Sequence, residues 1–333
     1  MLTFWRKLTD YMDNAATGAL AAAEAGADVI LANSVAPYAY DIAEAMGIPA
    51  LGAHLQPTEP AQRIHCDHEF GRSLGAWGKQ DHWPARSGRP GALRCPPSAR
   101  LRKELGLGKQ SRVAGERRRR KANATILHGI SPSVLPKPAD WHPGLVMAGY
   151  WWPAMKPDWQ PPTDLLDFLS DGTPPPVFVG FGSSAQIDPA FILKATRRAG
   201  VRAVVQGVEG TLGDDAIAVG SIPHEWLFPR MAAVVHHAGA GTTAAGFRAG
   251  VPAVGDSGVH GSAALGFTDR VARGGSPRPI PYKMLTPERL GDAITEAVST
   301  PSYAKRAAEV SAAIATEDGT GPVVEALRNL PSK

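Results

Sequence analysis

The 333-residue sequence contains little cysteine, since only Cys66 and Cys95 are present. Both lie in loop-like sequence without the spacing of metal ligands, so the sequence predicts neither a disulfide framework nor a zinc site. No apolar run approaches the roughly 18 residues that a membrane-spanning helix needs. The first residues also lack the apolar core of a secretory signal peptide. We therefore expect a cytoplasmic protein with reduced thiols and no bound metal.

A large excess of charge of either sign is also missing, because the formal net charge is only +4. Positive side chains are nevertheless concentrated at residues 112–121, in the sequence RVAGERRRRK. No aromatic residues alternate with them, as a stacking platform for bases would require, so nucleic acid is not an expected partner. A solvated helical face is the favoured interpretation, and peripheral contact with an anionic membrane surface is the alternative.

The length of the chain predicts two domains, because 333 residues exceed the size at which one hydrophobic core usually stops growing. A segment dense in proline and tryptophan is typical of a semi-rigid linker between them. The predicted divisions are a first domain at residues 1–148, a linker at 149–163, a second domain at 164–320 and a tail helix at 321–333.

Apolar spacing in the first domain predicts a helix at residues 1–24 and then a strand, helix and strand at 27–32, 38–46 and 49–55. A further strand is expected at 124–128, and no strand is assigned within the proline-rich segment 132–162. Too few strands precede Gln56 to complete a doubly wound sheet. We therefore expect an incomplete, N-terminally truncated domain whose unpaired sheet edge favours self-association.

Strands alternate with helices more regularly in the second domain. This alternation predicts an open parallel sheet covered by helices on both faces. The expected strands lie at residues 174–184, 201–206, 216–220, 232–236 and 251–254.

The most informative stretch is residues 232–254, AAVVHHAGAGTTAAGFRAGVPAV, which predicts a strand, a glycine-rich turn and a helix. Gly239 and Gly241 allow the backbone to approach a ligand closely. A helix N-terminus that follows such a turn presents unpaired N–H groups to an anion, and phosphate is the natural ligand. His237 and the hydroxyls of Thr242 and Thr243 could donate to the same phosphate. A tight connection without a ligand is the alternative.

A second glycine-rich turn permits another interpretation. The sequence from Gly180 to Ala185 fits the G-x-G-x-x-A dinucleotide fingerprint, and Glu209 follows the next strand, where a ribose-binding acid could lie. An NAD(P)-dependent oxidoreductase is therefore one alternative function. Two phosphate turns on one sheet are better explained by a single nucleoside diphosphate that lies across several strand ends.

Four segments carry a resemblance to a known family: GYWWP, PVFVGFGSS, SIPHEWLFPRMAAVVHHAGAGTTAAGFRAGVPAV and PRPIPYKMLTPERLGDAI. They resemble the family 1 UDP-glycosyltransferases, above all the bacterial sterol 3-beta-glucosyltransferase-like and antibiotic glycosyltransferases. The resemblance covers residues 23–327. It implies the GT-B fold, an α/β architecture of two Rossmann-like domains with parallel sheets, of which the N-terminal one is incomplete here.

The resemblance implies that the second domain binds a UDP-sugar and that the first binds the acceptor. His54 and Gln56 match part of the acceptor side. The residues that match the donor site are Gly182, Ser183, Ile222, Pro223, Trp226, His237, Gly239, Gly241, Thr242 and Thr243.

The implied reaction is an inverting, metal-independent transfer of a hexose, expected to be glucose, to a hydroxyl of an apolar acceptor such as a sterol, lipid or polyketide. The helix N-terminus and His237 would stabilise the leaving diphosphate in place of a metal. No cofactor is expected besides the UDP-sugar co-substrate.

The sequence departs from the family at two places. The strand and loop that carry the family's catalytic histidine have no match before Met1, so no residue is assigned as the base. The Asp-Gln pair that grips the sugar is also missing, and Asp256 or His260 could replace it. We therefore expect reduced or absent activity in this chain. A non-catalytic nucleotide-binding or partner protein is the alternative.

Overall fold

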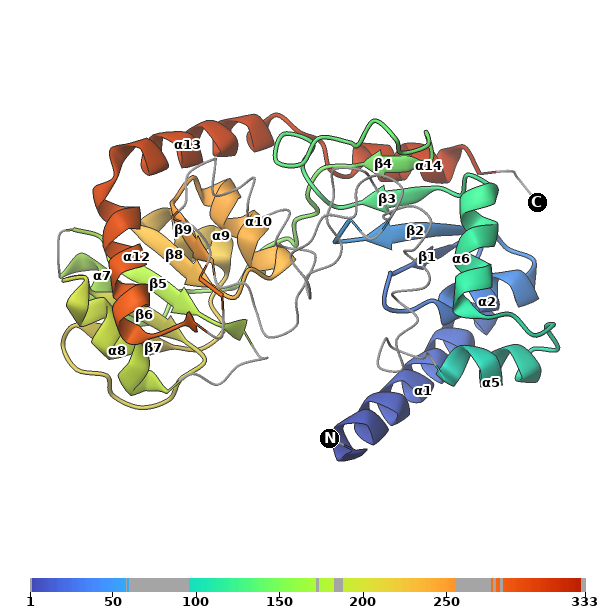
Figure 1. Cartoon of the computed structure of the whole chain (residues 1–333), viewed down its shortest axis with the longest axis horizontal. Helices are drawn as coiled ribbons and strands as arrows, with labels where there is room; N and C mark the ends of the chain where they lie inside the picture. The colour runs from blue at the N-terminus through green and yellow to red at the C-terminus, as the bar shows by residue number, and fades with distance from the viewer. Residues whose placement is uncertain are drawn as a thin grey trace.

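The computed structural model shows two halves, each built around a parallel sheet (Figure 1). In the described residues the first sheet has the strand order β1-β2-β3-β4 and the second the order β7-β6-β5-β8-β9. The predicted α/β class with two parallel sheets is therefore confirmed. The residues that the structure describes are 2–57, 59, 96–171, 174–182, 188–255, 277, 280–281 and 284–330.

The first half begins with a long helix and then adds strands one after another to the sheet. Gly47, in the left-handed conformation with φ +63°, ends the helix before the second strand. Its elements are α1 (Leu2–Glu24), β1 (Ile30–Ala32), α2 (Tyr38–Met46), β2 (Ala50–His54), α5 (Pro96–Glu104), α6 (Arg112–Lys121), β3 (Ile126–His128) and β4 (Leu145–Met147).

Strand β4 corrects the expectation for residues 132–162, where no strand was assigned. Leu145, at its start, is buried and pairs with Ile126 of β3. The strand is only three residues long, and Pro143, Gly144 and Gly149 surround it, so the turn-forming residues conceal its apolar run.

The second half is doubly wound. Its elements are α7 (Thr163–Ser170), β5 (Val177–Gly180), α8 (Pro189–Arg198), β6 (Ala203–Gln206), β7 (Ala216–Val219), α9 (His224–Leu227), the 3₁₀ turn η2 (Phe228–Arg230), β8 (Ala233–His236), α10 (Ala240–Ala249), β9 (Ala253–Gly255), α12 (Pro287–Ser299), α13 (Pro301–Ala315) and α14 (Gly321–Arg328).

Strand β5 lies at the centre of the second sheet, with β6 on one side and β8 on the other. The chain leaves β5 toward β6 and β7 and then returns to add β8 and β9 on the opposite side. Open α/β sheets bind ligands at the carboxyl ends of the two strands where the direction of winding reverses. The topology therefore predicts a ligand-binding site at the loops that follow β5 and β8.

Burial of both faces explains why β5 has an unbroken apolar sequence. Val177 and Val179 pack into one core with α8 and α12, while Phe178 packs into a second core with Leu165 and Phe228. Strands of parallel sheets that are covered on both faces show this pattern. The central strand is thus a rigid support for the turn that follows it.

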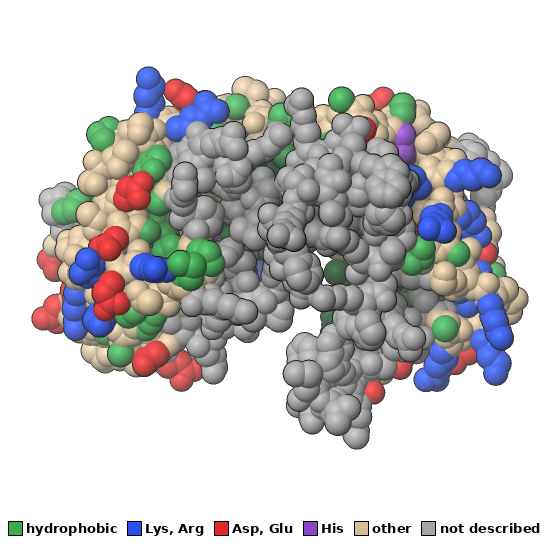
Figure 2. All heavy atoms as spheres, viewed as in Figure 1, with side chains coloured by type: hydrophobic (Ala, Val, Ile, Leu, Met, Phe, Trp, Pro, Cys, Tyr) green, Lys and Arg blue, Asp and Glu red, His purple; other side chains and the backbone are tan. Residues whose placement is uncertain are grey.

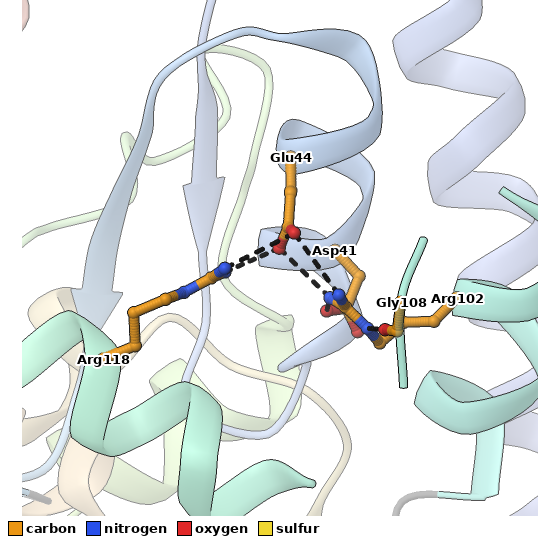
Figure 3. A network of polar contacts seen from close by, with 5 residues as sticks. All are labelled: Asp41, Glu44, Arg102, Gly108 and Arg118. Carbon is orange, nitrogen blue, oxygen red and sulfur yellow. Dashed lines mark hydrogen bonds and ion pairs between the residues drawn. The ribbon is translucent and has the colours of Figure 1, made fainter. Parts of the chain in front are cut away.

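A partly buried ionic network fastens α5 and α6 to α2 (Figure 3). Arg102 of α5 donates to Asp41 at 2.6 Å and to Glu44 at 3.1 Å, and its side chain is only 5% exposed. Arg118 of α6 donates to the same Glu44 at 2.6 Å. The hydrogen bonds from Arg118 and Arg102 lower the pKa of Glu44 to about 2, so this carboxylate stays ionised.

The two halves are connected by a shared apolar cluster and by hydrogen bonds to the segment that follows α13. Helix α13 runs from the second half back to the first, where α14 and the C-terminus lie (Figure 1). At the end of this return, Glu317 accepts from the hydroxyl of Ser131 at 2.7 Å. The indole of Trp151 donates to the carbonyl of Gly319 at 2.8 Å. Phe247 of α10 and Ile314 of α13 pack with Tyr150 in one apolar cluster.

None of the helices that the structure describes is long and apolar enough to cross a membrane.

Candidate nucleotide-binding site

The N-terminus of α10 follows β8 after a short turn, as the sequence predicts. Gly239 is the N-cap, and the first helical bond runs from the Thr243 N–H to the Gly239 carbonyl at 2.9 Å. The preceding N–H groups, of Ala240, Gly241 and Thr242, have no partner within the helix because they lie in its first turn. Together with the helix dipole they favour an anion at this position.

The imidazole of His237, from the loop after β8, packs against the loop after β5. Gly180 of β5 and His236 of β8 are paired in the sheet, so Gly182 and His237 follow them side by side. A Cβ added to Gly182 would lie 2.7 Å from Cε1 of His237, and one added to Gly239 would lie 2.6 Å from Nε2. Gly182 also has φ +67°. The imidazole of His237 thus leaves no room for a Cβ at either position, so both residues must be glycine.

The neighbouring His236 has a different role. It is buried, and its Nδ1 accepts a hydrogen bond at 3.1 Å from the N–H of Ala238. Ala238 adopts φ +55°, which is rare for a residue other than glycine. Burial lowers the pKa of His236 to about 3, so its imidazole is neutral and holds the turn. Strained backbone of this kind concentrates at functional sites.

A cavity of about 1170 Å³ opens between the two halves in front of this turn. Its walls include six of the residues predicted for the donor site: Gly182, Ile222, Pro223, Trp226, Gly241 and Thr242. The first half contributes Leu55 and Gly129, and the segment between the sheets contributes Trp151, Trp152 and Met155. The structure therefore brings the separate motifs of the sequence to one cavity.

Two arginines of the cavity wall each lie against the ring of a tryptophan. Arg230 lies 4.3 Å from the ring centre of Trp226, and Arg248 lies 4.7 Å from that of Trp152. Arg248 also contacts Glu225 at 3.2 Å and thus ties α10 to α9. Sequence reasoning missed these two arginines, although each stands within the motifs SIPHEWLFPR and AAGFRAG. Their charge favours an anionic ligand.

Of the other predicted donor residues, the structure describes His237, Gly239 and Thr243, and none of these three is on the cavity wall. The ring of His237 lies next to the wall residue Gly182 and next to Gly239. Thr243 is buried, so its hydroxyl does not face the cavity. The predicted positions Ser183, Asp256 and His260 lie outside the described residues.

On the acceptor side, His54 is buried and packs against His128 rather than lining the cavity. The two rings meet edge to face at 5.7 Å, and His128 stacks on Trp141 at 4.7 Å. Gln56 is half-buried and is also absent from the wall, where Leu55 stands instead. Burial lowers the pKa of His54 to about 3 and that of His128 to about 4.

These shifted histidines predict acid lability. The folded-state pKa values of His54 and His128 lie below the ordinary value of 6.5, so between pH 6.5 and about 4 the unfolded chain binds more protons. The free energy of unfolding should fall by about 1 kcal/mol per histidine for each pH unit below 6.5. Denaturant titrations across this range measure the slope. His128→Phe should reduce the slope by the contribution of one histidine, because phenylalanine retains the stacking but cannot be protonated, while His54 and His236 still titrate. A flat profile in the unmodified protein would contradict this expectation.

Among the residues that the structure describes, no group of three or more His, Cys, Asp or Glu side chains could hold a metal ion.

Residues 183–330 match the family described as "Erythromycin biosynthesis protein CIII-like, C-terminal domain". The chain is 40% identical over 207 residues to the O-mycaminosyltylonolide 6-deoxyallosyltransferase of Streptomyces fradiae. The matched region covers 58% of this chain and 46% of that protein. The chain is 36% identical over 231 residues to the sterol 3-beta-glucosyltransferase UGT80A2 of Arabidopsis thaliana, covering 63% of this chain and 35% of that protein. The chain thus spans less than half the length of these relatives.

Solved structures share the fold over almost the whole chain. The glycotransferase of kitacinnamycin has a TM-score of 0.68 at 20% identity and covers 98% of this chain and 83% of its own. Glycosyltransferase VinC in complex with DTDP has a TM-score of 0.63 at 21% identity, covering 97% and 78%. Residues 183–330 are therefore similar to the EryCIII-like C-terminal domain, and the chain is similar in sequence to sterol and antibiotic glycosyltransferases and has the GT-B fold.

Proposed function

We propose that this protein transfers a hexose, expected to be glucose, from a UDP-sugar to a hydroxyl of an apolar acceptor. The observation that carries the proposal is the position of His237, which lies against Gly182 at the switch point of the second sheet, beside the N-terminus of α10. The cavity in front of this site is walled by both halves, as a reaction between a donor and an acceptor requires.

In this reaction the acceptor oxygen forms a bond to the anomeric carbon, and the bond from that carbon to the diphosphate oxygen breaks. The electron pair of the broken bond leaves with UDP, and the hydroxyl proton passes to a general base or to water. In this proposal, the N–H groups at the start of α10 and the imidazole of His237 would stabilise the negative charge that develops on the diphosphate. This arrangement supports a reaction that does not depend on a divalent metal.

The apolar part of the wall supports an apolar acceptor. Leu55 and Met155 are 47% and 44% exposed and face the same cavity as Trp151 and Trp152. Exposed apolar side chains that converge on one cavity mark a ligand-binding surface. Sterols and polyketide aglycones have the matching chemistry.

The described geometry gives less support to a nicotinamide cofactor at the Gly180 turn. In the dinucleotide fingerprint a helix starts directly after the glycines, so that its N-terminus meets the pyrophosphate. Here α8 starts only at Pro189, and Asp188 caps it by accepting from the Ala190 N–H at 2.9 Å. The space beside Gly182 is filled by His237.

The test is incubation with UDP-glucose carrying a labelled sugar, with and without EDTA, in the presence of a sterol or a macrolide aglycone. Appearance of the label on the acceptor, unchanged by EDTA, is the expected result. One similar structure is a complex with DTDP, so a parallel reaction with TDP-glucose tests the base of the donor. Binding of UDP without transfer to any acceptor would favour the non-catalytic alternative.

A further inference from the structure

The end of the first half opposite the cavity carries a large excess of positive charge. Residues 96–122 contain ten Lys and Arg but only Glu104 and Glu116, a net charge of +8, whereas the whole chain carries +4. Figure 2 shows Lys and Arg gathered along this end of the molecule, over α5 and α6, while acidic and basic side chains are mixed on the other half. The charge of the molecule is therefore strongly polarised.

Internal contacts neutralise part of this charge. Arg102 and Arg118 bind Asp41 and Glu44, and Arg120 contacts Glu59 at 3.3 Å. Four exposed cations remain that have no acidic partner among the described residues. We refer to these four as the α5–α6 basic face: Lys103, Lys109, Arg117 and Lys121.

The network of Figure 3 makes this face rigid. Because Arg102 and Arg118 hold the same carboxylate of α2, they fix α5 and α6 relative to each other. Arg102 also donates to the Gly108 carbonyl at 2.8 Å, next to Lys109 in the connection between the helices. The basic face thus presents its charges from an ordered support.

Three exposed cations on α8, in the second half, are paired with acids. Lys194 contacts Glu288 at 2.6 Å, Arg197 contacts Asp215 at 2.7 Å, and Arg198 contacts Asp292 at 2.8 Å. These residues are exposed as well, yet each has an acid beside it. The second half also has exposed cations with no acidic partner among the described residues, such as Arg289 and Lys305, but these lie singly on different helices, whereas the α5–α6 basic face gathers four of them.

We propose that the α5–α6 basic face binds the anionic surface of a lipid bilayer. Clusters of four or more Lys and Arg are attracted to anionic lipids without a specific pocket. A nucleic-acid surface would need aromatic rings on which bases stack, and residues 96–122 contain no Phe, Tyr or Trp. The contact does not depend on the proposed sugar transfer, but it would bring the protein to a phase in which apolar acceptors dissolve.

The test is co-sedimentation of the whole chain with vesicles of phosphatidylcholine alone or mixed with phosphatidylserine. The expected result is binding to the mixed vesicles only, weakened by added salt because exposed charges are screened. The variant K103A/R117A/K121A should bind about 100-fold more weakly, since each charge near the surface contributes about fivefold.

The matched control is K194A/R197A/R198A, which removes the same charge from the paired cations of the second half and should bind as the unmodified protein does. Both variants should retain UDP affinity, which shows that they are folded. Equal loss in both variants, equal binding to neutral vesicles, or binding to single-stranded RNA without vesicle binding would each overturn the proposal.

Discussion

Gly182→Ala is expected to weaken UDP binding by about 100-fold or more while the protein stays folded. The added Cβ would lie 2.7 Å from Cε1 of His237, closer than real contacts allow, so the imidazole must leave its place. The position also has φ +67°, where a residue with a Cβ is strained by about 1–2 kcal/mol. If His237 contacts the diphosphate as we propose, its displacement costs more than this strain. Isothermal titration calorimetry with UDP measures the loss.

Gly200→Ala is the matched control for this variant. Gly200 has nearly the same backbone, with φ +66°, but an added Cβ meets nothing within 4 Å. It follows α8 and lies outside the cavity wall. This variant should lose about 1 kcal/mol of stability and retain UDP affinity. Unchanged UDP affinity in Gly182→Ala would show that the position of His237 is irrelevant to the ligand.

Arg102→Ala is expected to destabilise the first half by about 3 kcal/mol, because removal of one partner from a buried ionic network leaves the other charges uncompensated. Its guanidinium contacts Asp41, Glu44 and the Gly108 carbonyl, and its side chain is 5% exposed. Chemical denaturation followed by tryptophan fluorescence measures the change, since Trp141 lies in the core of this half.

Arg100→Ala provides the comparison for Arg102→Ala. Arg100 stands on the same helix and contacts Glu104 at 2.8 Å, but its side chain is 71% exposed. Solvent-exposed ion pairs contribute little to stability, so this variant should unfold almost as the unmodified protein does. Equal destabilisation by the two variants would contradict the assigned role of the buried network.

Local sequence signals predicted most elements of this fold. The helix at residues 38–46 was bounded correctly because Gly47 ends it. The strand, turn and helix around His237 were also predicted, since all of their determinants lie within one short stretch. Signals of this kind act over a few residues and need no tertiary contact.

Contacts between distant residues could not be predicted. The pairing of β4 with β3, the packing of His54 on His128 and the contact of Gly182 with His237 each depend on strand register. The cavity wall depends in addition on how α13 returns the chain to the first half, which no local pattern specifies. The burial of Thr243 is a further example, because its neighbour Thr242 reaches the cavity and it does not.

The most direct test of the central claim is a calorimetric titration of the unmodified protein with UDP, TDP and NADH in one buffer containing EDTA. We expect saturable binding of UDP that is lost in His237→Ala, and no binding of NADH. Binding of NADH without binding of UDP, or UDP affinity unchanged in His237→Ala, would contradict a diphosphate site at the N-terminus of α10.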